Sequence, residues 1–419
     1  MAAISSPGLG SGLDVNSLVT QLMAAERKAP TARLDSASSL NDSRLSALDT
    51  IRTALGKLAT ATDALASPGT FQTRTATVGN PSALGVTASR VAVPGSYEVE
   101  IGQLARADKL ASERFSSAFE AVGTGTLTIA FGTWDADATT FTPNAAKAST
   151  SIVIDASNNT LAGIRDAVNA AGAGVTASII GDGVGQRLVF SGGESGAANG
   201  LKITVANDGD GNATDAAGLS RLAFDPAANV GSGRNLTQSV AAQDAEFSID
   251  GLDLTSSSNL VGSAIAGLTL TLKAETTAPT TIEIARDDAT AAKAVSGFVD
   301  AYNAVASAMK TASGYDAGSQ KGGPLIGDSS VLSVMNRLRG VMVSSIAGLG
   351  GASSLKSVGV SFQKDGSLSF DADALASALN DNADAVARLF GATGKPSDSR
   401  VSVVTSAPTT KTGDYAVEI

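Results

Sequence analysis

Few side chains in this sequence could carry catalysis, because histidine and cysteine are absent from all 419 residues. Without histidine the chain lacks the commonest general base and metal ligand, and without cysteine it lacks thiolate nucleophiles and disulfides. Paired carboxylates remain, Asp135 with Asp137 and Asp371 with Asp373, which are the residue types used in glycoside hydrolysis. The first pair is expected in a loop and the second at the start of a helix, so neither pair predicts an enzyme.

Two further groups of residues are of types found in binding sites. Residues 208–212, Asp-Gly-Asp-Gly-Asn, resemble the beginning of a calcium-binding loop, but Ala213 and Leu219 replace the glycine and glutamate that such a loop needs. Trp134 and Tyr315 are of the types that stack on sugars, although lone aromatic residues occur on many surfaces. We therefore predict no catalytic residue, no cofactor and no metal.

Composition and charge exclude further classes. The formal net charge of −10 disfavours nucleic acid, whose phosphates would repel this surface. No run of apolar residues is long enough to cross a membrane, so we expect no membrane insertion. Residues 1–10 have neither the charged nor the apolar region of a secretory signal peptide, and we expect export, if it occurs, without a cleaved signal.

The elements that position everything else begin with the first 66 residues, where we predict two helices. Asp14 can cap the first helix, whose apolar face carries Val15, Leu18, Val19 and Leu22. Pro30 is expected to break or kink this helix before a longer one, residues 31–66. The longer helix has apolar residues at alternating steps of three and four, the spacing of a seam that packs along another helix: Leu48, Ile51, Leu55, Leu58 and Leu65.

The middle of the sequence is expected to form strands. Tyr97, Val99 and Ile101 alternate with glutamates, and Asp250-Gly251 between apolar residues predicts a two-residue hairpin. Between these two β blocks lies a different pattern, with a helix that Thr160 can cap. A β pattern that is interrupted and then resumed predicts one domain inserted into another.

Helical periodicity returns after residue 287. Phe298 and Tyr302 lie in a seam that runs to Lys310, a second helix can begin at Asp328 or Ser329, and one or two short helices are expected over residues 371–390. These helices are the candidate partners of the seam in residues 48–65. The alternative for the seam of residues 287–310 is that it packs within one subunit and has no other role.

The last residues repeat an earlier segment. Residues 404–419 align without gaps on residues 86–101, with identical residues at Val404, Thr405, Gly413, Tyr415, Val417, Glu418 and Ile419. We expect residues 401–419 to be the start of a truncated β repeat and the chain to be a fragment of a longer one.

Short motifs spread over residues 1–400 resemble the flagellar filament-capping proteins, the hook-associated protein 2 family. They are Gly8–Val15 with Leu18, Val19, Leu22, Met23, Glu26 and Pro30; Gly95–Tyr97 to Leu104 and Ala105; Phe247–Gly251; Gly267–Leu270; Phe298–Asn303; Gly323–Asp328; Val358–Val360; Gly366–Leu368; and Leu389–Gly391. Residues 160–205 are also similar to the hook-type insert motif of flagellins.

The resemblance implies an α+β multidomain fold, in which both chain ends form a helical, coiled-coil leg domain and nested β-rich head domains are inserted between them. The expected parts are a flexible terminal helical segment at 1–40, ordered only in the assembled cap; a leg domain of 41–75 and 286–400; a β-rich head domain of 76–112 and 235–285; and an inserted α+β head domain at 113–234.

The resemblance also implies a secreted structural protein at the flagellum tip, a homo-oligomeric cap that promotes flagellin folding and insertion and prevents loss of exported monomers. Its expected partners are flagellin, hook–filament junction proteins, other copies of the chain and an export chaperone. Residues expected to bind partners are Leu13, Val15, Leu18, Val19, Leu22, Leu48, Ile51, Leu55, Leu58, Leu65, Phe298 and Tyr302. The alternative function is a surface adhesin that binds host glycans or mucin through the insert.

Overall fold

The computed structural model describes residues 14–67, 69–135, 137–318, 320–346, 349–391, 398, 400–401 and 415–418. Contacts divide the chain into two compact units. Met1–Thr73 with Asp287–Ile419 form the first, called the helical unit below, and Arg74–Arg286 form the second, called the β-rich unit. Most of the predicted β repeat at 401–419 lies outside the described residues.

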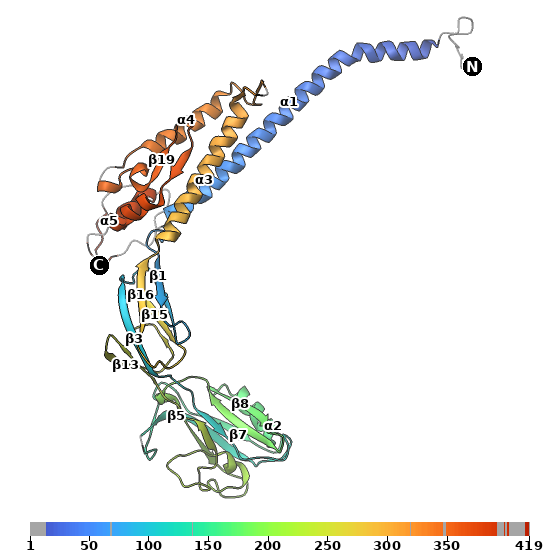
Figure 1. Ribbon diagram of the computed structural model, residues 1–419. Coiled ribbons are helices and arrows are strands. Elements are labelled where there is room, and N and C mark those ends of the chain that lie inside the picture. The colour runs from blue at the N-terminus through green and yellow to red at the C-terminus, as the bar shows by residue number, and fades with distance from the viewer. Residues whose placement is uncertain are drawn as a thin grey trace, which may run out of the picture. The chain divides into compact units, whose positions relative to one another are not determined.

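The first element of the helical unit is one helix of 52 residues, α1 (Val15–Ala66), and not the two helices predicted from Pro30. Asp14 caps it as expected, because its Oδ1 accepts a hydrogen bond from the Ser17 N–H at 3.0 Å. Proline removes one backbone donor at a cost of about 3 kcal/mol, but the residues around Pro30 are mostly good helix formers that continue the helix on both sides. The helix bends in its N-terminal part, as Figure 1 shows.

Three more helices and two small hairpins complete the helical unit. The helices are α3 (Asp288–Ser313), α4 (Ser329–Val343) and α5 (Ala372–Phe390), with η3 (Gly350–Ala352) and η4 (Leu355–Val358) as short 3₁₀ turns. The hairpins pair β17 (Tyr315–Asp316) with β18 (Lys321–Gly322) and β19 (Val360–Phe362) with β20 (Leu368–Phe370). Asp287, Asp328 and Asp371 cap the three helices, and Asn382 has non-helical dihedral angles that divide α5 in two.

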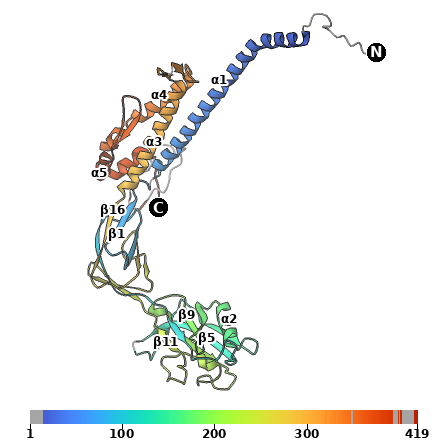
Figure 2. The same cartoon turned by 45° about the vertical axis from the view of Figure 1, so that its right-hand side comes forward.

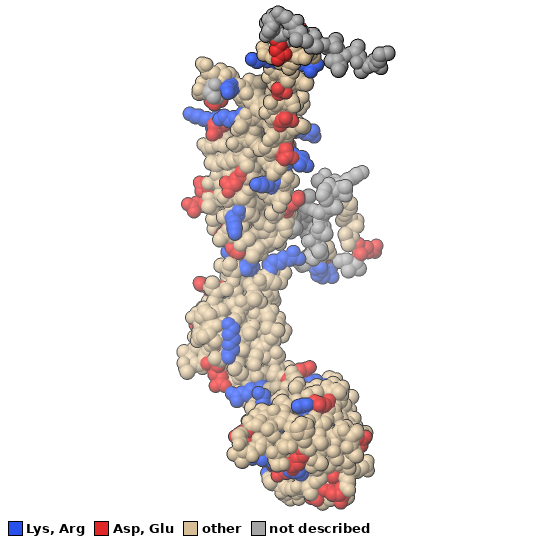
Figure 3. Space-filling view, turned by 90° about the vertical axis from the view of Figure 1, so that its right-hand side faces the viewer, with Lys and Arg blue, Asp and Glu red and all other residues tan. Residues whose placement is uncertain are grey.

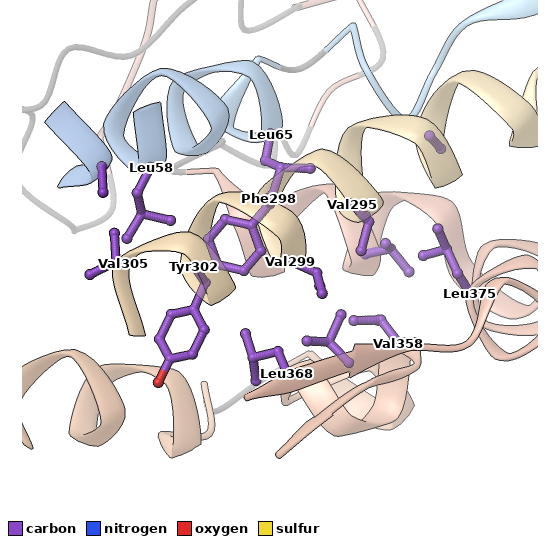
Figure 4. Packing of buried hydrophobic residues seen from close by; sticks show 14 of the residues in the cluster. Leu58, Leu65, Val295, Phe298, Val299, Tyr302, Val305, Val358, Leu368 and Leu375 are labelled. Atoms are coloured by element: carbon purple, nitrogen blue, oxygen red, sulfur yellow. The ribbon is translucent and has the colours of Figure 1, made fainter. Parts of the chain in front are cut away.

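The helical unit has one apolar core, which Figure 4 shows from close by. Leu58 and Leu65 of α1 pack on the side chains of α3, and Tyr302 of α3 lies against β19, with its ring 5.9 Å from that of Phe362. The core residues that Figure 4 labels are Leu58, Leu65, Val295, Phe298, Val299, Tyr302, Val305, Val358, Leu368 and Leu375. The predicted packing of residues 48–65 against the C-terminal helices is therefore present, apart from Leu48.

In the β-rich unit, two sheets share what we call the framework core. One sheet has the order β1-β16-β3-β12-β13 and the other β14-β15-β2. The strands are β1 (Arg74–Val78), β2 (Leu84–Ala88), β3 (Gly95–Gln103), β12 (Ala245–Ile249), β13 (Leu252–Ser256), β14 (Leu260–Val261), β15 (Leu268–Leu272) and β16 (Thr280–Arg286). The predicted hairpin is present, because Asp250 and Gly251 have φ values of 50° and 78°.

The elements between β3 and β12 in the sequence, among them α2, β5, β9 and β11 in Figure 2, enclose a second apolar core, which we call the insert core. Its sheets have the orders β10-β5-β6, with β7 also on β5, and β11-β4-β9-β8. Its elements are β4 (Lys109–Ala111), β5 (Gly125–Trp134), β6 (Phe141–Pro143), β7 (Thr150–Ile154), α2 (Leu161–Ala170), β8 (Val175–Gly181), β9 (Gln186–Gly192), η1 (Ala197–Asn199), β10 (Gly200–Ala206), η2 (Gly218–Leu222) and β11 (Thr237–Val240). Thr160 caps α2 as predicted.

Candidate assembly surface on the long helix

The two ends of α1 have different surroundings. In its C-terminal part Ile51, Leu58 and Leu65 are buried in the core of the helical unit, and Leu58 is only 5% exposed. In its N-terminal part the large apolar side chains are exposed, and Leu34 is 70% exposed. A leucine in water loses the stabilisation of about 1.5–3 kcal/mol that burial would give. The N-terminal part therefore presents apolar surface that the described residues leave uncovered.

Arg44 marks where α1 meets the rest of the helical unit. Its Nε donates a hydrogen bond to the Pro324 carbonyl at 3.2 Å. Pro324 lies in the loop before α4, where Gly323 has no room for a Cβ because that atom would lie 2.3 Å from the Ala312 carbonyl oxygen. We define the assembly surface as the exposed apolar side chains on α1 before and just after Arg44: Leu18, Val19, Leu22, Met23, Leu34, Leu40, Leu45 and Leu48.

The predicted partner-binding residues fall into three groups. Leu13 and the Val15 side chain lie outside the described part of the chain. Leu18, Val19, Leu22 and Leu48 are exposed. The third group belongs to the core of the helical unit. Leu55 is partly buried there, and the buried members are Ile51, Leu58, Leu65, Phe298 and Tyr302. The structure thus brings the last group together inside one chain and leaves the second group uncovered.

The predicted seam is wrong at Leu48, which is 47% exposed. A straight α-helix turns by about 20° per heptad relative to an ideal seven-residue seam, so successive seam positions move off the buried face. Small residues take part in this packing instead: Ala54 is buried, and Ala47 and Ala61, each seven residues away, pack on the core. The seven-residue spacing of these alanines could have indicated the buried face, but the sequence prediction considered only the larger apolar residues. Met23, Leu34, Leu40 and Leu45 were also missed as surface residues.

The carboxylates considered for chemistry have structural roles. Asp135 accepts hydrogen bonds from the hydroxyl and backbone N–H of Thr139, which lower the pKa of its carboxyl to about 2 and close a loop. Asp371 caps α5. Asp208, in the loop that resembles a calcium site, accepts hydrogen bonds from the backbone N–H groups of Leu219 and Ser220. Within the described ranges, no three acidic side chains are grouped as metal ligands.

A second apolar surface lies on α4. Leu332, Val341 and Val343 are exposed there. A cavity of about 410 Å³ lies between α3, α4 and the turn that joins β19 to β20, and its lining includes Met309 and Met335. Arg337 and Arg339 also lie on α4, which has no acidic residue. This helix therefore combines exposed apolar side chains with positive charge.

One face of the helical unit carries charges of both signs (Figure 3). Acidic and basic side chains are interspersed along the helical unit on the face that Figure 3 shows. Among the described helices, none is both long and apolar enough to cross a membrane. Exposed apolar helix faces of this kind mark surfaces for contact with other proteins. The class that these features indicate is therefore an assembly protein.

Comparisons with known proteins identify the family. The family model for the N-terminus of flagellar hook-associated protein 2 matches residues 11–108, and that for its C-terminus matches residues 242–414. The B-type flagellar hook-associated protein 2 of Pseudomonas aeruginosa is 35% identical over 402 residues, 93% of this chain and 81% of the relative. That of Escherichia coli strain K12 is 33% identical over 407 residues, 94% and 82% of the two chains. The chain belongs to the flagellar hook-associated protein 2 family.

A solved structure agrees with this assignment. This chain matches the crystal structure of the D1-D2-D3 domains of the Escherichia coli flagellar cap protein FliD with a TM-score of 0.65 and 28% sequence identity. The match covers 82% of this chain and 89% of the FliD chain. The predicted family and the predicted multidomain α+β fold are confirmed. The family is one of structural flagellar cap proteins and not of enzymes.

Proposed function

We propose that this chain forms the cap at the distal end of the bacterial flagellar filament, where it promotes flagellin folding and insertion and prevents loss of exported monomers. Family membership supports the capping role. The observation that carries the mechanism is the assembly surface on α1, which exposes leucines that the chain's own core does not cover. These side chains provide a contact surface without any chemical step.

The contact would be helix against helix. The leucines of the assembly surface offer an apolar stripe to an amphipathic partner helix, and we propose that flagellin and hook–filament junction proteins supply such helices. A few leucines give about 1.5–3 kcal/mol each when fully buried, before the loss of translational freedom is subtracted. One such contact is therefore weak and reversible, and a homo-oligomeric cap would hold the filament by making several contacts at once.

The remaining parts of the proposal concern export. We propose that the chain reaches the flagellum tip without a cleaved signal peptide and that an export chaperone covers the assembly surface beforehand. A chaperone is expected because an uncovered apolar stripe of this size favours aggregation. Residues 14–40 would be flexible before assembly and become ordered in the cap.

The second candidate function, glycan binding by the insert, has no observation in its favour. Trp134 was its best aromatic residue, but the indole Nε1–H donates to the Leu201 carbonyl at 3.2 Å. Its ring also packs on Phe141, with centroids 4.8 Å apart, and the Lys202 ammonium lies 5.4 Å from it. The partly buried side chain of this tryptophan is therefore held by contacts within the insert.

The test replaces leucines of the assembly surface by glutamate. Leu18→Glu with Leu22→Glu is introduced into a strain that lacks its own copy of the gene, and flagellin in the medium and swimming are measured. The matched control is Gln21→Glu, an exposed residue of the same helical turns whose side chain bonds only to Ser17. We expect the double variant to release flagellin and to lose motility, while the control swims like wild type.

Two outcomes would contradict the proposal. If the double variant is secreted, reaches the tip and supports normal filaments, the assembly surface has no role in capping. If neither variant nor a deletion of the whole gene affects filament growth, the capping function itself is wrong. Secretion of the double variant is measured separately, so that a block in export is not mistaken for a failed cap.

A further inference from the structure

The segments that connect the framework core to the insert core are bonded to one another. The Arg106 N–H donates to the Gln243 carbonyl at 2.9 Å, and the Gln243 N–H returns a bond to the Arg106 carbonyl at 3.1 Å. Their glutamine side chains add a second pair: Gln103 Nε2 donates to the Asp244 carbonyl at 2.9 Å, and Gln243 Nε2 donates to the Leu104 carbonyl at 2.9 Å. The two connections therefore form one ladder instead of two free linkers.

Each core also holds this ladder from its own side. Asn259, before β14 of the framework, binds Ala105 in both directions, with Nδ2 donating to the carbonyl at 2.9 Å and Oδ1 accepting from the N–H at 2.8 Å. On the insert side, the fully buried Asp108 accepts from the Leu201 N–H at 2.8 Å and from Gln238 Nε2 at 2.9 Å. Bending at the ladder would break bonds to buried groups on both sides.

The cores also touch directly, beside the ladder. The Ser195 hydroxyl of the insert donates to the Ser257 carbonyl of the framework at 2.7 Å. The Ala197 N–H, on η1 of the insert, donates to Asp244 Oδ1 at 2.8 Å. The Ser195–Ser257 contact lies outside the two connections, whereas the Ala197–Asp244 contact joins η1 to the second connection. The cores therefore meet beside the ladder as well as through it.

Gly196 shows how closely they meet. A Cβ on this residue would lie 2.7 Å from the Ser257 Cβ and 3.0 Å from the Ser257 backbone oxygen. Its N–H donates to the Arg106 carbonyl at 3.2 Å, which places the ladder and the direct contact against one another. The space between the cores is therefore too small for any side chain at this position.

We propose that the ladder, Asn259, Asp108 and the Gly196–Ser257 contact form a rigid joint, so that the framework core and the insert core move as one body. A hinge between inserted domains needs a few residues that absorb changes in φ and ψ without losing buried contacts. Here the connecting residues are bonded to each other and to both cores. A lateral load on the insert would be transmitted to the framework without rotation between them. The proposal does not depend on the capping function.

The full-length chain allows a direct test, because it has no native cysteine and introduced cysteines can be spin-labelled specifically. Ala156→Cys with Thr281→Cys, both exposed, measures the distance between the cores by double electron–electron resonance. A second pair, Thr255→Cys with Thr281→Cys, lies wholly in the framework. Its distance distribution gives the width expected when both labels are on one rigid body. We expect the two distance distributions in wild type to be similarly narrow.

Gly196→Ala is the perturbing substitution, and Gly211→Ala is its control. Gly196 has a φ of +105° and Gly211 a φ of +91°, so alanine is strained at both, but only at Gly196 does its Cβ meet another core. We expect Gly196→Ala to shift or broaden the distance distribution between the labels at 156 and 281, which lie on different cores. The distance distribution between the labels at 255 and 281, both in the framework, should stay unchanged. Ser195→Ala, which removes one hydrogen bond without a clash, should broaden the distribution between the cores less.

Three results would overturn the proposal. One is a broad or two-peaked distribution between the cores in wild type. Another is an unchanged distribution in both Gly196→Ala and Ser195→Ala. The third is equal broadening in Gly211→Ala, because the effect would then come from local strain and not from the joint.

Discussion

Asn303 of α3 binds the backbone of Leu368 in β20 in both directions. Its Nδ2 donates to the Leu368 carbonyl at 2.9 Å, and its Oδ1 accepts from the Leu368 N–H at 2.8 Å. The asparagine side chain therefore replaces a neighbouring strand for this one residue and fixes the β19–β20 hairpin on α3. It also gives a physical role to the last residue of the motif at residues 298–303.

We predict that Asn303→Ala destabilises the helical unit by about 2–6 kcal/mol, because two polar groups of the buried Leu368 lose their partners at about 1–3 kcal/mol each. Denaturant unfolding followed by circular dichroism measures this. The control is Asn336→Ala on the exposed face of α4, for which we expect little change. Equal effects of the two substitutions would show that the Leu368 bonds contribute nothing special.

Tyr302 gives a prediction of the opposite kind. Its side chain is fully buried, and the hydroxyl has no hydrogen-bond partner among the described residues. Removing an unsatisfied buried hydroxyl relieves its desolvation, so Tyr302→Phe should be neutral or should stabilise the chain by up to about 1 kcal/mol. Tyr302→Ala should instead cost about 3–5 kcal/mol through loss of packing. A marked loss of stability in Tyr302→Phe would reveal a partner for the hydroxyl.

The two ends of α1 can be compared with the same substitution. Leu58→Ala removes a buried side chain and should destabilise the helical unit by about 2–5 kcal/mol. Leu34→Ala, on the same helix but exposed, should change the free energy of unfolding by less than about 0.5 kcal/mol. Thermal and denaturant unfolding of both variants measure the difference. A large loss in Leu34→Ala would mean that the N-terminal part of α1 is covered in the isolated chain.

Amide hydrogen exchange should show a boundary near Arg44. Residues 51–65 pack on the core and are expected to exchange slowly. Among residues 14 and 16–40, whose burial is described, no large side chain is buried, so this segment should exchange quickly in the isolated monomer. Mass spectrometry of peptic fragments locates the boundary. Strong protection before residue 40 in a monomer would contradict the proposed flexibility of this segment.

The stability of the insert should depend on pH through Asp108. Burial raises the pKa of its carboxyl above the ordinary 3.8, so the folded state binds its proton more tightly than the unfolded state. The stability that this proton provides is present below pH 3.8 and is lost as the pH rises through the raised pKa. We therefore expect the free energy of unfolding of Asp108→Asn to increase relative to that of wild type as the pH rises from 3.8 through the raised pKa. Fluorescence of Trp134, the single tryptophan, follows the unfolding.

Asp155 serves as the control of opposite sign. Hydrogen bonds from the hydroxyl and N–H of Ser157 lower the pKa of this exposed carboxyl, so its stabilisation is present above pH 3.8 and is lost as the pH falls through the lowered pKa. Wild type and Asp155→Asn should therefore converge in strongly acidic solution. If both substitutions change stability in the same direction over the same range, burial is not the cause of the Asp108 effect.

Local patterns predicted the local structure well. The predicted caps at Asp14, Thr160 and Asp371 are present, and of the two candidates Asp328 and Ser329 the cap is Asp328, because a helix start depends on a few adjacent residues. The Asp250-Gly251 turn was found for the same reason. The expected break at Pro30 is absent, because the many helix-forming residues on both sides outweigh the cost of one proline.

Long-range contacts could not be predicted in this way. The partners Asn303 and Leu368 are 65 residues apart, and no periodicity relates them. The strands β4 and β11, of three and four residues, are too short for a strand pattern. Leu110 in β4 and Leu236 beside β11 nevertheless belong to the insert core. The residue limits of the separate head and leg domains, and the partner-binding role of the exposed leucines, stay predictions.

The nesting of the units has a consequence for how such chains can diversify. Arg74 pairs with Arg286 at the open end of the β1–β16 ladder, and within the helical unit the Asp287 N–H donates to the Thr73 carbonyl at 2.9 Å. The chain thus leaves and re-enters the helical unit at adjacent residues, and the Arg106–Gln243 ladder repeats this arrangement one level further in. A segment with neighbouring ends can be exchanged, shortened or duplicated by recombination with little change in loop-closure entropy for the rest. Each inserted level can therefore vary in sequence and length while the elements on either side of it keep their packing.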